Sequence, residues 1–226
     1  MLGSVSLSNT PRSTLTRHRE RGRTDLADLY AVLDAGLICH FGLIRDGAPV
    51  VLPTGYGRID DTIYLHGSTG AGYLSTIDGA PICLTVTHLD GIVYARSVFH
   101  HSMNYRSGVV HGIARYVTDP DEKWAALEAI VEHLAPGSWT YTRQPDRREL
   151  AATAVIALSL AEASVKVRSG PPSDDADDIA AGGRWAGVVP VRSSFGTPES
   201  GPAIPEPVPE HVTNRERPTP GQRSAE

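Results

Sequence analysis

The segment CLTVTHLDGIVYARSVFHHSMNYRSGVVHGIARYV, residues 83–117, carries the strongest strand signal of the chain and its densest group of reactive side chains. The first run, Pro81–Leu89, is rich in β-branched residues, which favour strands. It ends at Asp90-Gly91, a dipeptide that accepts positive φ and is typical of a tight hairpin turn. We therefore expect a second strand to begin at Ile92.

A third strand is predicted from Tyr105 to Val117, after an irregular segment that contains His100 and His101. Residues two apart in a strand share a face, so Gly108 and Gly112 fall on the same face of this strand. The other members of that face are Arg106, Val110 and Ala114. A face with so few large side chains predicts the close approach of a flat neighbour, either a partner strand or an aromatic ring system.

The chain has 226 residues, enough for one domain with tails, and its 40% hydrophobic residues suffice for a core. We predict a basic N-terminal arm over residues 1–24 and a domain over 25–170. A proline-rich, acidic tail follows over 171–226, of which 184–192 docks back on the domain. The net charge of −5 and the pI of about 6.0 argue against a nucleic-acid partner.

Cys39 and Cys83 are the two cysteines of the chain, and each lies in an apolar run. Since no CxxC pair is present, they indicate buried thiols rather than a disulfide framework or a zinc site. No apolar run reaches the length of a membrane span, and no apolar signal segment opens the sequence. We therefore expect a cytoplasmic protein without a membrane partner.

Helices are predicted where apolar residues repeat at helical spacing. Two of them, over 25–35 and 119–134, are each opened by an aspartate that can cap the first turn, and a further helical turn is expected over 147–152. A short helix is also expected to run through Leu74 and Ile77 to Gly79.

Strands are predicted over four further runs, 37–44, 49–56, 62–66 and, as the last strand of the sheet, 153–160. Short strands joined by glycine turns exclude a βαβ repeat. They favour an antiparallel fold that is mainly β with flanking helices, a closed or split β-barrel, because a barrel has no exposed strand edges. Residues after about Gly196 have many prolines and no apolar period, so we expect them to be extended or disordered.

A glycine-rich turn, HGSTGAG at residues 66–72, joins a predicted strand to the short predicted helix. Such turns present backbone N–H groups and the positive end of a helix, which together can bind an anion. The spacing matches neither a P-loop nor a dinucleotide-binding fingerprint. The turn is a candidate phosphate site, and a plain turn without a ligand is an equal alternative.

Four segments share a pattern with a known family. They are VLPTGY at 51–56, DTIYLHGS at 61–68, ARSVFHHSMNYRS at 95–107 and SVKVRSGPP at 164–172. With them the chain, over about residues 17–192, resembles the pyridoxamine-phosphate-oxidase-like flavoproteins, in particular the branch that includes nitroimidazole-resistance proteins. The resemblance implies an FMN-binding split barrel that forms a homodimer with the flavin at the subunit interface.

The resemblance also implies which residues form the site. The isoalloxazine ring would be lined by Val51, Leu52, Pro53, Thr54 and Tyr56. The ribityl phosphate would face His66, Gly67 and Ser68. The neighbouring strand would contribute Arg106 and Ser107. A small-molecule substrate would meet His100, His101 and Tyr105.

In one place the sequence departs from the family pattern. Ala71-Gly72 stand where a Ser-Arg or Arg-Lys pair commonly holds the phosphate. Charge-assisted bonds from arginine are about twice as strong as neutral ones, so we expect lower FMN affinity unless Arg106, Arg96 or an arm arginine takes this place. Haem, a deazaflavin or another planar cofactor therefore stays open as an alternative to FMN.

The histidines allow another interpretation. His66, His100, His101 and His111 could converge on a metal or haem iron, because neutral imidazole is the commonest metal ligand. Their spacing matches no zinc pattern, so we predict no metal site and interpret them first as hydrogen-bonded histidines.

Two functions from different classes remain. The first is an FMN-dependent oxidoreductase that reduces or oxidises a small molecule. The second is a non-catalytic protein that binds flavin or haem for storage or sensing. A hydrolase built on Ser102, His101 and Asp90 is set aside, because the sequence has no nucleophile elbow.

Overall fold

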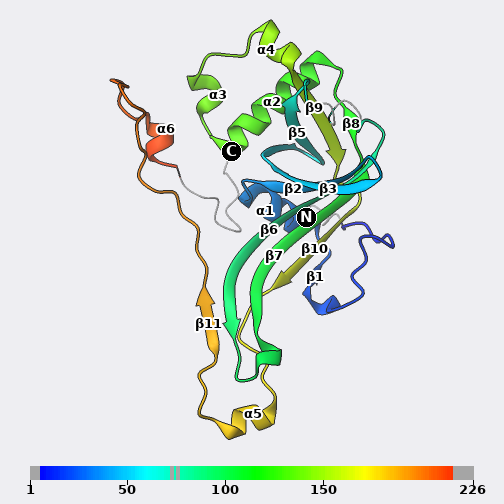
Figure 1. The fold of residues 1–226 in the computed structure, drawn as a ribbon, viewed down its shortest axis with the longest axis vertical. Coiled ribbons are helices and arrows are strands. Elements are labelled where there is room, and N and C mark those ends of the chain that lie inside the picture. Colours follow the sequence, from blue (N-terminus) through cyan, green and yellow to red (C-terminus); the bar gives the residue numbers. More distant parts are fainter. Residues whose placement is uncertain (1–5, 72–73, 75–76, 216–226) are drawn as a thin grey trace, which may run out of the picture.

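The computed structural model describes residues 6–71, 74 and 77–215, and within them the strands form two antiparallel sheets (Figure 1). The larger sheet has the order β1-β10-β7-β6-β2-β3, with β11 also paired to β6, and the smaller has the order β4-β5-β9-β8. The larger sheet consists of β1 (Gly22–Arg23), β2 (Cys39–Arg45), β3 (Ala48–Thr54), β6 (Pro81–Tyr94), β7 (Ser102–Ile113), β10 (Ala163–Arg168) and β11 (Gly187–Pro190). The smaller consists of β4 (Tyr56–Ile59), β5 (Thr62–Ser68), β8 (Arg115–Tyr116) and β9 (Thr153–Ser159). This arrangement confirms the predicted mainly antiparallel split barrel with flanking helices.

Helices flank the sheets. They are α1 (Leu26–Ala35), α2 (Pro120–Leu134), α3 (Ser138–Tyr141), α4 (Arg147–Ala152), α5 (Ala176–Ala181) and α6 (Glu210–Thr213). As predicted, aspartates cap the two longest: the Asp25 carboxylate accepts the Ala27 N–H, and Asp119 accepts the Glu122 N–H. The predicted turn at 147–152 is confirmed as α4. The short helix predicted through Leu74 and Ile77 falls on 72–73 and 75–76, which lie outside the described residues.

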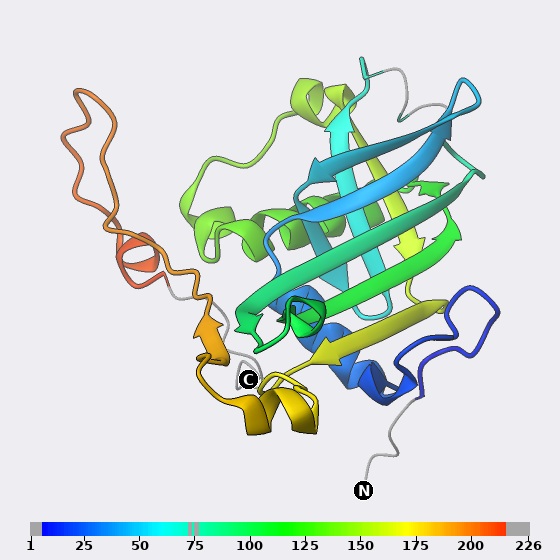
Figure 2. The same cartoon turned by 60° about the horizontal axis from the view of Figure 1, so that its bottom comes forward.

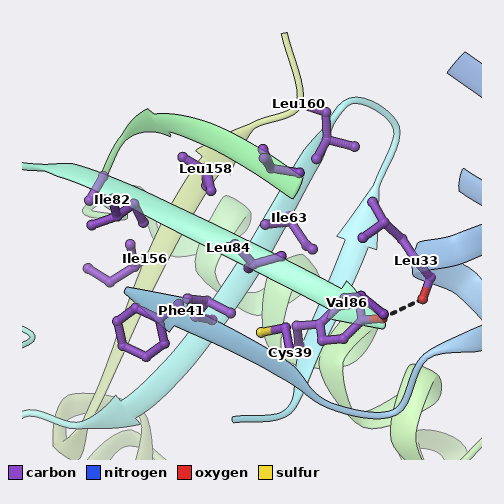
Figure 3. Close-up of a cluster of buried hydrophobic side chains, with 14 of the residues drawn as sticks. Leu33, Cys39, Phe41, Ile63, Ile82, Leu84, Val86, Ile156, Leu158 and Leu160 are labelled. Carbon is purple, nitrogen blue, oxygen red and sulfur yellow. Dashed lines mark hydrogen bonds between the residues drawn. The ribbon is translucent and has the colours of Figure 1, made fainter. Parts of the chain in front are cut away.

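The core lies between the two sheets and under α1 (Figure 3). Phe41, Leu84, Ile63 and Ile156 come from both sheets and are at most 2% exposed. The Tyr56 hydroxyl donates to the Leu33 carbonyl of α1, so the helix is tied to the smaller sheet across this core.

The chain does not reverse at Asp90-Gly91, and that prediction was wrong. β6 runs without a break from Pro81 to Tyr94, with a bulge between Leu89 and Gly91, and the chain turns at a 3-10 turn, Val98–His100. Gly91 serves the packing of β11, because a Cβ there would lie 2.9 Å from a Val188 methyl group. The same residues that favour a hairpin also favour a bulge, since both disturb the regular ladder.

The glycine-rich face of β7 does meet a close neighbour, but that neighbour is the protein's own core. A Cβ at Gly108 would lie 3.0 Å from Leu29 of α1, and one at Gly112 would lie 2.5 Å from Leu158 of β9. Val110 and Ala114 are buried on the same face. This face is therefore filled within one chain and is not available to a ring system or a second subunit.

Residues 153–160 do not form the last strand, so this prediction also was wrong. β10 returns along β7, and β11 pairs with Gly91–Tyr94 of β6, in the region that was predicted to dock back. Residues 196–209 contain no helix or strand and are mostly exposed, as expected for a proline-rich tail, and α6 follows them. No helix in the described part of the chain is long and apolar enough to cross a membrane.

Candidate functional site

The outward side of the larger sheet, called here the outer face, carries several predicted site residues (Figure 2 shows the strands side by side). It is the side of β3, β2, β6 and β7 that points away from α1 and the core. Two rows of paired residues cross these strands: Val51, Gly42, Cys83 and His111, and beside them Pro53, His40, Thr85 and Val109. Most of these side chains are small, so the surface admits a flat ligand.

The structure brings together some of the predicted flavin-binding residues on this outer face. Val51 is 64% exposed, Pro53 is also exposed, and Tyr105 and Ser107 lie on the same side of the sheet two strands beyond β2. Leu52 packs against the core from the opposite side of β3.

Tyr56 does not line this surface. Its side chain is fully buried, its hydroxyl is bonded to Leu33, and its ring stacks on His133 at 4.6 Å between ring centres. The Tyr56 side chain, from a residue expected beside the flavin ring, is therefore not open to this surface. Tyr56 starts β4 in the smaller sheet, whereas the preceding site residues belong to β3, and this change of sheet turns its side chain inward.

The turn after β5 offers no free backbone donors among its described residues. The Thr69 N–H donates to the Ala152 carbonyl, the Gly70 N–H to the Ser68 hydroxyl, and the Ala71 N–H to the Ser68 carbonyl. A phosphate held by these N–H groups, as the sequence suggested, would have to replace bonds that the chain already makes. Gly72, the last residue of the predicted anion site, lies outside the described residues.

Arg106 lies away from this turn, on the inward side of β7. Its Nε and Nη2 atoms donate to the two Asp90 carboxylate oxygens, each at 2.9 Å. The guanidinium lines a cavity of about 690 Å³ near the end of α1, together with His88 and Arg192. No described contact joins Arg106 to Ser68, so the chain does not assemble the predicted phosphate clamp from these two residues.

The four histidines do not converge. His100 contacts the Asp175 carboxylate at 3.1 Å, and His101 contacts the Ser97 carbonyl at 3.0 Å, both at the end of the β6–β7 hairpin. His111 is on the outer face and His66 on the smaller sheet. Within the described residues, no group of three or more histidine, cysteine or acidic side chains is placed to hold a metal ion.

His66 opens into a cavity of its own, about 310 Å³ in volume, between the smaller sheet and the helices α2, α3 and α4. The imidazole is exposed at the cavity mouth, and the groups around it desolvate it and so lower its pKa. The apolar part of the lining is Leu127, Val131, Trp139 and Leu150. The site thus places an imidazole with a lowered pKa beside an apolar space.

Sequence reasoning missed most of this cavity. Trp139 and Arg143 come from a segment for which no element was predicted, and the Arg143 guanidinium is bound by both oxygens of Glu149 at 2.9 and 2.7 Å. Glu132 accepts the N–H groups of Gly137 and Trp139, each at 2.7 Å, and so fixes the turn that carries Trp139. The aromatic residues just after Pro136-Gly137 were the sequence feature from which this cavity could have been predicted.

The fold is thus an antiparallel split barrel with an outer face and a histidine-bearing cavity. Comparison with known proteins gives the family: residues 25–167 match the family model described as pyridoxamine 5'-phosphate oxidase. The chain belongs to this family. A search of curated proteins found no match.

Two solved structures are similar over nearly the whole chain. A flavocytochrome, Anf3, from Azotobacter vinelandii is 40% identical, with a TM-score of 0.85, and the match covers 90% of this chain and 95% of that one. An FAD and heme binding protein from Mycobacterium smegmatis is 38% identical, with a TM-score of 0.83, over 88% of this chain and 100% of that one.

A Bacteroides thetaiotaomicron protein, described as a candidate 5-nitroimidazole antibiotic resistance protein, shares the fold at lower similarity. It is 22% identical with a TM-score of 0.50, and the match covers 65% of this chain and 86% of that one. The predicted likeness to the nitroimidazole-resistance branch is thus confirmed at the level of the fold.

Proposed function

We propose that this protein is a homodimer that binds a flavin, as FAD, together with haem, and that it acts as an oxidoreductase on a small molecule. One observation carries the proposal: the chain is 40% and 38% identical, over about nine tenths of its length, to a flavocytochrome and to an FAD and heme binding protein. FAD replaces the FMN of our sequence-based expectation. The lack of an arginine pair at Ala71-Gly72 agrees with a cofactor whose terminal group is not a simple phosphate.

The outer face fits a flavin. Gly42, Cys83 and Val109 leave the surface flat enough for a planar ring, and the exposed Val51 and Pro53 add apolar area beside it. Because this apolar surface is exposed in the single chain, we expect a second copy of the chain to cover the ring from the other side.

We assign the haem to the His66 cavity. Desolvation lowers the pKa of His66 and so favours the neutral imidazole, whose lone pair could bind an iron atom. Trp139, Leu127 and Val131 would supply apolar contact for a porphyrin.

Bound together, the two groups supply hydride acceptance and one-electron transfer. The chain's own residues hold and shield them. His66 would supply a nitrogen ligand, Trp139, on the α2–α3 turn fixed by Glu132, would exclude water, and the outer face would orient the flat ring.

An absorption spectrum of the purified protein tests the proposal. We expect flavin bands together with a haem Soret band, and FAD rather than FMN on acid extraction and chromatography. His66→Ala is expected to lose most of the Soret band and keep the flavin bands, whereas His100→Ala, at the hairpin end, is expected to keep both. A protein that takes up neither cofactor on reconstitution would refute the proposal. Bound cofactors without oxidation of a reduced nicotinamide would refute its catalytic part and favour the storage or sensing alternative.

A further inference from the structure

A cavity of about 690 Å³ lies beside the edge of the outer face and away from the His66 cavity. Its walls are the end of α1, the middle of β6 and the segment that follows β11. The apolar lining consists of Ala35, Leu37, Ile38, Val86, Leu89 and Val191. A site with this size and lining suits a small organic molecule.

The β6 wall of this cavity is an open strand edge. On this side β6 pairs with β2 up to Thr85 and with β11 from Gly91 onward. Between these points no described strand pairs with β6 on this side, so a short stretch of main chain faces the cavity. An unpaired strand edge offers N–H and C=O groups to a ligand.

The charged groups of the cavity favour an anion. Two guanidinium groups, of Arg106 and Arg192, face one carboxylate, that of Asp90. The Asp90 carboxylate accepts hydrogen bonds from Nε and Nη2 of Arg106. The third nitrogen, Nη1, is closed from solvent and has no hydrogen-bond partner in the described part of the chain. Because a buried charged donor without a partner is unfavourable, a small opening of the cavity wall that lets a ligand acceptor reach Nη1 would be favoured.

The segment after β11 forms the third wall. The Val191 N–H donates to the Asp90 carbonyl at 3.1 Å, which holds the exposed Arg192 and Ser193 over the opening. The segment therefore adds a cation to the rim and closes the side that the body of the domain leaves open.

We propose that this cavity binds a small organic acid with a flat apolar body, whose carboxylate is held by Arg106 and Arg192. The ligand's apolar part lies against Leu37, Ile38 and Leu89, and its remaining polar atoms meet the open edge of β6. This site shares no lining residue with the His66 cavity, and the proposal does not depend on the proposed cofactors.

Benzoate is the probe, and its binding is measured by isothermal titration calorimetry on the full chain as purified. We expect a Kd of about 1 mM or tighter for benzoate, and at least about tenfold weaker binding of benzamide, which has the same shape without the charge. Ser193→Trp, which fills the opening, is expected to abolish binding. Arg192→Ala is expected to weaken it about 10-fold or more, since it removes a charge-assisted bond.

The control is Arg45→Ala, an exposed arginine at the end of β2 that pairs only with Asp46 among the described residues, and it is expected to leave binding unchanged. The double variant Asp90→Asn/Arg106→Gln removes the paired charges together and is expected to lose benzoate binding while circular dichroism stays native. No benzoate binding by the unaltered protein would overturn the proposal. Binding that Ser193→Trp and Arg192→Ala leave unchanged would overturn it equally, whether or not the double variant folds.

Discussion

The two faces of the larger sheet differ in what packs against them, although the same strands form both. The inner face carries Gly108 and Gly112 on β7 and is filled by Leu29 of α1 and Leu158 of β9. The outer face carries Gly42 and Ser107, and its residues His40, Val51 and Pro53 are exposed. Glycines in a strand thus mark close approach, but which partner approaches depends on where the helix and the second sheet come to lie.

The largest contrast between the faces is expected from neighbouring residues of β6. Leu84 is fully buried on the inner face, and Cys83 beside it is half-buried on the outer face. Leu84→Ala is expected to lower the free energy of unfolding by about 2–5 kcal/mol, because it leaves a cavity in the core. Cys83→Ala is expected to cost about 0.5 kcal/mol. Urea unfolding of both variants checks the difference, and equal losses would mean that the two faces are equally packed.

Filling the glycine face is expected to have a smaller effect. Gly108→Ala adds a Cβ at 3.0 Å from Leu29, so α1 must shift or Leu29 must change rotamer, at a cost of about 1–3 kcal/mol. Ser107→Ala on the outer face removes only a weak bond to the Lys166 carbonyl and is the matched control, with about 0.5 kcal/mol or less. Thermal unfolding at fixed protein concentration measures both. A stabilised Gly108→Ala would show that the inner face has unused room.

The outer face can be tested through the proposed dimer. Val109→Arg places a charge in the middle of this face and is expected to weaken self-association about tenfold or more, a loss of about 1.4 kcal/mol. Glu128→Arg, on the exposed side of α2, is the control and is expected to leave association unchanged. Sedimentation equilibrium measures the self-association constants of the parent protein and of both variants. A parent protein that is monomeric at micromolar concentration would remove the dimer from the proposed function.

The smallest effect is expected at the edge of the sheet, where the N-terminal arm docks. The Glu162 carboxylate accepts hydrogen bonds from Arg12 and Thr10. These bonds, of which the one from Arg12 has the larger effect, lower the pKa of Glu162 from 4.5 to about 2. Since the folded pKa is depressed, the contribution to docking is complete above about pH 4.5 and is lost as the pH falls toward 2.

Hydrogen exchange of residues 7–17, corrected for the intrinsic rate, is expected to rise over this window while β9 stays protected. Glu162→Gln is expected to give a weakly docked arm at every pH in that range. An arm whose exchange does not respond to pH in the parent protein would contradict the role of this ion pair.

Short-range patterns in the sequence determined most of the helices and strands. The Asp25 and Asp119 caps, the apolar stripe of α2 and the β-branched runs each act over a few residues, so helices and most strands could be predicted from sequence. The return of residues 187–190 to the sheet was predictable in the same way, because they are the apolar stretch in an otherwise polar tail.

Only the tertiary structure decided what each element faces. Asp90-Gly91 suits a turn or a bulge, and the pairing of β11 and the Arg106–Asp90 ion pair select the bulge. Tyr56 continues the pattern of β3, yet the chain passes into the second sheet at Gly55, and its side chain enters the core. The His66 and Arg106 cavities are each lined by residues far apart in sequence, and such convergence depends on packing between elements, which no local pattern encodes.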